Sequence, residues 1–168
     1  DFTLKSGLKS EYFFNIASFF NSQDIHFLAN QYFKVIQKSG LEFDAMYGPA
    51  YKGIPLATAI SQLFYIEEKK KIELIFDRKE IKDHGEGGKL IGNISGKKIL
   101  IIDDVLTAGT AIKETVEIIQ HNNAKAVAAI VALDRMEKDS NSLTFKENLE
   151  KNLSIPILSI TTFQDLKK

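Results

Sequence analysis

Residues 98–111 read KILIIDDVLTAGTA, and this stretch decides the fold. Its four consecutive apolar residues, 99–102, are too few for a buried helix but suit a strand that is covered on both faces. Asp103 and Asp104 follow at once, where the carboxyl end of that strand is expected. After a few small residues, a helical spacing of apolar side chains begins at Ile112. The stretch therefore predicts a strand, an acidic pair, a short loop and a helix.

The loop between this strand and this helix has the composition of a phosphate site. Thr107, Ala108, Gly109 and Thr110 are small, so the backbone can approach a ligand closely. The free N–H groups and the dipole of the helix point at the loop, and parallel sheets bind ligands beyond the carboxyl ends of their strands. The carboxylates of the acidic pair would lie next to a phosphate of the same charge and would not bind it. We therefore expect sugar hydroxyls or Mg²⁺ as their partners. A generic strand-turn-helix with an acidic N-cap is the alternative.

Composition narrows the class of protein. The 168 residues are enough for one domain with a substantial core. Lys+Arg and Asp+Glu both number 22, so no overall basic field favours nucleic acid, and anion specificity must come from local clusters. Cysteine is absent, which excludes thiolate chemistry and is compatible with a reducing cytosol. No apolar run is long enough to span a bilayer, and we predict a cytoplasmic location.

Apolar strands alternate with amphipathic helices along the whole chain. This alternation predicts an α/β fold, a doubly wound and mainly parallel sheet, with a small hood made by the N-terminal piece and the end of the chain. The last strand contains Pro156 and is therefore expected at an edge of the sheet. The predicted strands are 12–15, 43–47, 73–77, 99–102, 126–133 and 155–160.

Two further glycine-bearing stretches are candidate anion sites. Residues 48–53 superficially resemble a Walker A loop, but the spacing is wrong and no Ser or Thr follows Lys52. That loop can still offer Tyr51 and Lys52 to a phosphate. Residues 78–92 mix cations with four glycines and do not fit a dinucleotide fingerprint. They predict a mobile lid that orders over an anion, with a flexible linker as the alternative.

The pattern in 98–111 resembles the phosphoribosyl pyrophosphate (PRPP) signature of the type I phosphoribosyltransferases. That signature has apolar residues, two acids, two spacers and then Thr-Ala/Gly-Gly-Thr. The rest of the chain resembles the orotate phosphoribosyltransferases of that family, most specifically in Lys-Asp-His-Gly-Glu-Gly at 82–87, which separates them from the purine-base transferases. The matching islands, in the family's order, are 2–7, 12–15, 48–53, 78–80, 82–87 and 134–135.

The resemblance implies transfer of ribose 5-phosphate from PRPP to N1 of orotate, giving orotidine 5′-monophosphate and pyrophosphate. It implies Mg²⁺ as cofactor, held mainly through PRPP and water rather than by protein ligands. It also implies a homodimer whose lid cations come from the neighbouring subunit, with no nucleic acid or membrane as partner. The single domain, 1–168, is expected to lack a helix that family members have before the first island and another after the last strand.

The resemblance also assigns roles to residues. Asp103 and Asp104 are implied at the ribose hydroxyls and the surroundings of the metal, and with Lys82 and His84 they form the expected catalytic set. The 5′-phosphate is assigned to Thr107, Ala108, Gly109, Thr110 and Ala111; the pyrophosphate to Tyr51, Lys52, Arg78, Lys79, Lys82 and His84; and orotate to Lys5, Phe13, Phe14 and Arg135.

Two other classes of function stay open at the level of sequence. One is a phosphoribosyltransferase for purine or other salvaged bases, which turnover with orotate against hypoxanthine or uracil would distinguish. The other is a non-catalytic regulator that senses PRPP or binds nucleic acid. Such a regulator would be expected to lose the lid cations or to display a basic face, and this sequence does neither.

Overall fold

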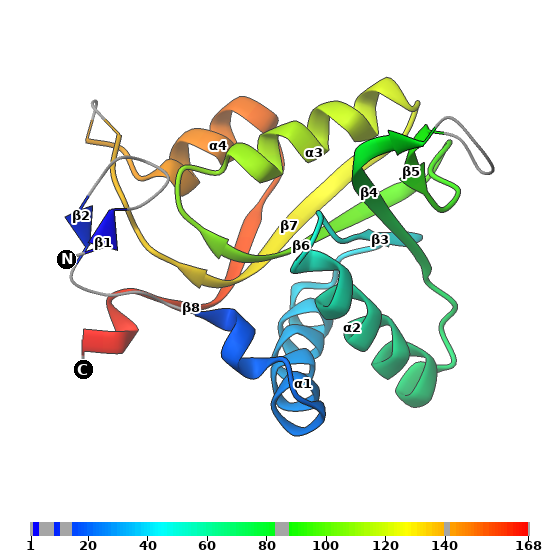
Figure 1. Cartoon of the computed structure of the whole chain (residues 1–168), viewed down its shortest axis with the longest axis horizontal. Helices are drawn as coiled ribbons and strands as arrows, with labels where there is room; N and C mark the ends of the chain where they lie inside the picture. Colours follow the sequence, from blue (N-terminus) through cyan, green and yellow to red (C-terminus); the bar gives the residue numbers. More distant parts are fainter. Residues whose placement is uncertain (1, 4–8, 11–14, 83–87, 140–141, 168) are drawn as a thin grey trace.

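The computed structural model describes residues 2–3, 9–10, 15–82, 88–139 and 142–167. Its helices lie in two layers on either side of a central sheet (Figure 1). In chain order the elements are β1 (Phe2–Thr3), β2 (Lys9–Ser10), η1 (Ile16–Phe19), α1 (Ser22–Ser39), β3 (Ala45–Tyr47), α2 (Gly53–Glu68), β4 (Glu73–Lys82), β5 (Gly88–Ile91), β6 (Lys98–Leu106), α3 (Thr110–His121), β7 (Lys125–Asp134), α4 (Phe145–Leu153), β8 (Ile157–Thr162) and η2 (Asp165–Lys167).

The central sheet has six strands in the order β5-β4-β3-β6-β7-β8. All neighbouring pairs are parallel except β4 with β5, which is antiparallel. The fold class predicted from the alternation of strands and helices is therefore confirmed, and β8 does lie at an edge. The short pair β1–β2 and the turn η2 lie at the end of the molecule where β6 and β7 finish, which is the place of the expected hood (Figure 1).

Both faces of the sheet are covered, which explains the continuous apolar run in β6. The four side chains 99–102 are fully buried. Leu100 and Ile102 pack in the cluster under α1 and α2, whereas Ile99 and Ile101 pack in the cluster under α3 and α4. Successive side chains of a strand point to opposite faces, so a strand between two helix layers must be apolar at every position.

Several element boundaries differ from the sequence prediction. β6 continues to Leu106, so the acidic pair lies inside the strand and not after it. β4 continues to Lys82 and pairs with β5, so both flanks of the expected lid are strands. Asn21 caps α1 by accepting hydrogen bonds from two N–H groups of its first turn.

The expected strand at 12–15 falls outside the described residues, apart from Asn15. Within the part of the chain that is described, no helix is long and apolar enough to cross a membrane.

Candidate active site

The loop from β6 to α3 leaves the start of a helix open to a ligand. Gly109 is the N-cap of α3, and no side chain caps the helix there. Its φ of 75° is a conformation that costs any residue with a side chain, and a Cβ at this position would overlap Leu149 of α4. Glycine is therefore required, and among the described residues no side chain makes a capping hydrogen bond at the start of α3. This arrangement suits a phosphate.

The acidic pair lies just before this loop, near the carboxyl end of β6. The Asp104 carboxylate accepts a hydrogen bond from Lys52 Nζ at 3.0 Å, and Asp103 Oδ1 accepts the Asp104 N–H at 2.9 Å. Below them, the buried Tyr32 hydroxyl of α1 donates to the Asp103 carbonyl oxygen at 2.7 Å. Lys52 therefore holds the Asp104 carboxylate, whereas the Asp103 carboxylate is bonded within its own strand and Tyr32 holds the Asp103 backbone.

Burial first, and then the neighbouring charge of Asp104, raise the pKa of Asp103 to about 7. Lys52 and the Asp104 N–H oppose this shift only in part. A carboxylate with a raised pKa is one whose charged form lacks enough partners. The hydroxyl groups of a sugar, or a cation near them, would supply the missing interactions.

The loop 48–53 lies against the same strand from the other side. A Cβ on Gly53 would come within 2.7 Å of the Ile102 carbonyl oxygen, so α2 begins in close contact with β6. The N–H of Ala50 donates to Asp77 Oδ1 of β4 at 2.9 Å, and the peptide bond after Ala50 is cis. Tyr51 is exposed at the tip of this loop, next to Lys52.

Arg135 lies beside the phosphate loop because its N–H donates to the Leu106 carbonyl oxygen at 3.2 Å. Its guanidinium is almost fully buried, and Nε donates to Glu137 Oε1 at 2.7 Å. Sequence reasoning did not single out Glu137. The available signal was an acid two residues beyond Arg135, at the carboxyl end of a buried strand.

The structure brings part of the predicted set together at one edge of the sheet. Arg78 follows Asp77, whose side chain holds the loop 48–53, and Lys79 and Lys82 continue the backbone of β4. Four predicted residues lie outside the part of the structure that is described: Lys5, Phe13, Phe14 and His84. The residues around the β6–α3 loop are Asp103, Asp104, Lys52, Thr107, Ala108, Gly109, Thr110, Ala111 and Arg135.

Among the described residues, no group of three or more His, Cys, Asp or Glu side chains could enclose a metal ion. Mg²⁺ does not require such a cage, since it usually keeps several waters and binds substrate phosphates together with one or two carboxylates. The acidic pair beside an open helix N-terminus fits a Mg²⁺ bound in this way.

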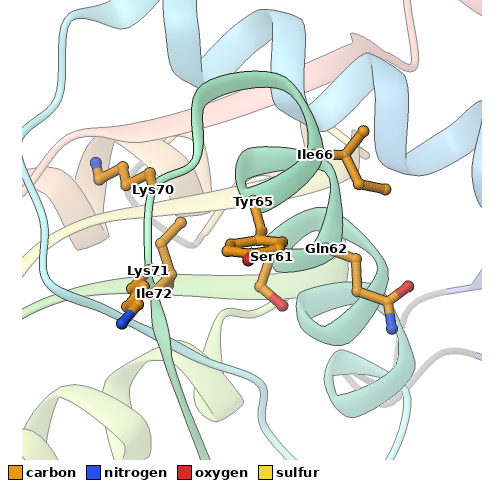
Figure 2. A pocket seen from close by; sticks show the side chains of 7 residues that line it. All are labelled: Ser61, Gln62, Tyr65, Ile66, Lys70, Lys71 and Ile72. Carbon is orange, nitrogen blue, oxygen red and sulfur yellow. The ribbon is translucent and has the colours of Figure 1, made fainter.

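A cavity of about 480 Å³ lies elsewhere and is not part of this site (Figure 2). It is formed by the last turns of α2 and the residues that lead into β4, at the amino-end edge of the sheet. Its lining residues are Ser61, Gln62, Tyr65, Ile66, Lys70, Lys71 and Ile72.

Comparison with known proteins identifies the class. The phosphoribosyl transferase domain matches residues 17–156. Orotate phosphoribosyltransferases from Escherichia coli O139:H28 and Pasteurella multocida are 43% and 46% identical over 166 residues, which cover 99% of this chain and 78% of each relative. The crystal structure of orotate phosphoribosyltransferase from Francisella tularensis superposes with a TM-score of 0.83 at 38% identity, over 98% of this chain and 79% of that one.

The chain belongs to the phosphoribosyltransferase family, and its relatives at this identity are orotate phosphoribosyltransferases. This confirms the family predicted from residues 98–111 and from the other islands. The same identity argues against the two alternatives, a purine-base transferase and a non-catalytic regulator.

Proposed function

We infer that this chain is an orotate phosphoribosyltransferase, which transfers ribose 5-phosphate from PRPP to orotate and releases pyrophosphate. The observation that carries the inference is the β6–α3 junction, where an acidic pair, an uncapped helix N-terminus and Arg135 meet at one edge of the sheet. A ribose phosphate needs hydroxyl acceptors next to a phosphate cradle, and these elements offer both. The identity of 43–46% with enzymes of that name supports orotate as the base.

In this reaction C1 of the ribose becomes oxocarbenium-like while pyrophosphate leaves, so negative charge grows on the leaving group. Groups that meet this charge stabilise the transition state more than the ground state. When bound, Mg²⁺ would supply positive charge at the pyrophosphate. The cations that we assign to the same task are Lys52, Arg78, Lys79 and Lys82, together with Tyr51 and His84 as pyrophosphate contacts.

The protein's own groups would orient the sugar. We propose that residues 107–111 hold the 5′-phosphate through backbone N–H groups and hydroxyls, while Asp103 and Asp104 accept hydrogen bonds from the ribose hydroxyls. Lys52 is 46% exposed and bonded to Asp104. It can exchange that partner for the pyrophosphate when substrate arrives. Lys5, Phe13, Phe14 and Arg135 are proposed to frame orotate, since a guanidinium suits its carboxylate.

Orotate consumption, followed with and without PRPP and Mg²⁺, tests this proposal. We expect orotate to be consumed only when PRPP is present, with pyrophosphate released in equal amount. Hypoxanthine and uracil in place of orotate provide the matched controls. Turnover of hypoxanthine or uracil but not orotate would show a salvage enzyme, and tight PRPP binding without turnover of any base would show a regulator.

We also propose a cytoplasmic homodimer in which the lid residue Lys82 serves the active site of the neighbouring subunit. Subunit mixing tests this arrangement with two inactive homodimers, Asp103→Ala and Lys82→Ala. In a mixed dimer one site would receive both lesions and the other none. Random reassortment makes half the dimers mixed, so activity should return to about a quarter of wild type. No recovery, with subunit exchange verified by mass, would place each lid over its own subunit's site.

A further inference from the structure

Arg135 and Glu137, which follow β7, form a buried ion pair. The role proposed for Arg135 does not by itself explain why Glu137 is buried with it. The side chains of Arg135 and Glu137 are only 7% and 11% exposed, and Nε and Oε1 lie 2.7 Å apart. Burying two charges is costly, and replacing such a pair by apolar residues is often neutral or stabilising. A buried pair beside a ligand site therefore points to a role other than stability.

The backbone around this pair is held from three sides. The Arg135 N–H bonds to Leu106 of β6, and the N–H of Phe145, the first residue of α4, donates to the Glu137 carbonyl oxygen at 2.9 Å. Between them, Met136 has a φ of 56°, and its N–H donates to the buried Asp134 carboxylate at 2.8 Å. A left-handed methionine is unfavourable, so this tight turn persists because its surroundings determine it.

The turn fixes how the guanidinium lies. A guanidinium is planar, and its donors form a rigid fork, so a hydrogen bond at Nε to a fixed carboxylate sets the plane of the whole group. The backbone of Glu137 is held in turn by α4 through the N–H of Phe145, and Leu149 of the same helix lies against Gly109 of the β6–α3 loop. The guanidinium and the phosphate cradle are thus tied to the same helix.

We propose that Glu137 is a positioning residue, which holds the Arg135 guanidinium in the plane in which it receives the carboxylate of orotate. The inference rests on the proposed function. Before substrate binds, Glu137 neutralises the buried charge; after it binds, the same bond keeps the fork aimed at the orotate carboxylate. The pair has no net charge, so recognition depends on the geometry of the fork more than on a general attraction for anions.

Steady-state kinetics of Glu137→Ala and Glu137→Gln test the proposal, with orotate and PRPP varied separately. For Glu137→Ala we expect the KM for orotate to rise about tenfold, which is the effect of one charged hydrogen bond. Glu137→Gln keeps the shape and an acceptor oxygen, so its rise should be smaller. The KM for PRPP should stay within about twofold in both, because residues 107–111 are intact.

Glu42→Gln is the matched control, since it breaks an ion pair with Lys98 that is exposed and lies at the other edge of the sheet. It should change neither KM. A positioning role also predicts that Glu137→Ala has little further effect on kcat/KM for orotate once Arg135 has been replaced by Ala, because the residue it acts through is gone.

An orotate KM that is unchanged or lower in Glu137→Ala would overturn the proposal, and so would equal losses for both substrates. An equally large effect in the Arg135→Ala background would do the same. These results differ from failure of the proposed function itself, in which the wild-type protein would not consume orotate at all.

Discussion

At the amino-end edge of the sheet, the Glu73 carboxylate bonds Lys97 Nζ at 2.7 Å and accepts the N–H of Asn93 at 2.8 Å, and these bonds lower its pKa. At the carboxyl-end edge, Asp103 is crowded against Asp104, and burial raises its pKa to about 7. Both carboxylates belong to the same six-stranded sheet. The charged form of Glu73 has partners that stabilise it, whereas the charged form of Asp103 has too few.

This difference separates groups that stabilise the fold from groups that serve a ligand. A carboxylate with a lowered pKa contributes to stability at neutral pH, whereas one with a raised pKa costs stability there. Asp103, the carboxylate that costs stability, lies near the open N-terminus of α3 and near Arg135. We expect substitutions at the two edges to have opposite consequences.

The largest expected effect is at Arg135. Arg135→Ala should weaken the binding of orotate by about 2–4 kcal/mol, because a buried charged contact is lost, and should change the binding of PRPP far less. Its counterpart at the amino-end edge is Lys97→Ala, which removes the partner of Glu73 and should leave both substrate constants unchanged. Kinetics with each substrate varied make the comparison. An unaltered orotate KM and kcat in Arg135→Ala would refute its assignment to the orotate carboxylate.

Glycine substitutions sharpen the contrast between the edges at the level of backbone. Gly109 and Gly96 have nearly the same φ, 75° and 72°, but only Gly109 faces another side chain, that of Leu149. Gly96→Ala should cost about 1 kcal/mol for the left-handed conformation, and Gly109→Ala about 2–3 kcal/mol because overpacking is added. Only Gly109→Ala should weaken the binding of PRPP. Urea unfolding and PRPP binding check both, and equal losses would argue against close packing of the loop.

The sequence allowed the centre of this fold to be predicted because the physical signals there are local. A strand buried on both faces leaves an unbroken apolar run at 99–102. The last strand does lie at an edge, but it begins at Ile157, so Pro156 precedes it and is not inside it as predicted. The signature at 103–110 is equally local, since strand, loop and helix start are consecutive. The extension of β4 to Lys82 was missed because its alternating charges favoured a loop.

What the sequence could not supply are contacts that depend on the order of the strands or on an unusual backbone conformation. Lys52 meets Asp104 only because β3 lies next to β6, and no pattern in either stretch fixes that order. The Arg135–Glu137 pair depends on the left-handed turn at Met136, a residue whose type gives no hint of that conformation. Raised pKa values follow from such contacts and from burial, so the state of Asp103 was equally beyond prediction.

The measurement that tests the account most directly is the free energy of unfolding, with kcat/KM, for Asp103→Asn and Glu73→Gln. The folded-state pKa of Asp103, about 7, lies above its unfolded value, so wild-type stability falls as pH rises from about 4 to 7. Asp103→Asn lacks this loss. It should be about 1–3 kcal/mol more stable than wild type at pH 8, and less than half as much at pH 5.

Glu73→Gln should show the opposite result. Its pair with Lys97 is partly exposed, so stability should fall by only about 0.5–1 kcal/mol at pH 8, with kcat/KM unchanged. Asp103→Asn, in contrast, should lose about tenfold in kcat/KM for PRPP, the effect of one charged hydrogen bond. An Asp103→Asn protein that is less stable than wild type at pH 8, or as active, would contradict the division of the sheet into a stabilising edge and a catalytic edge.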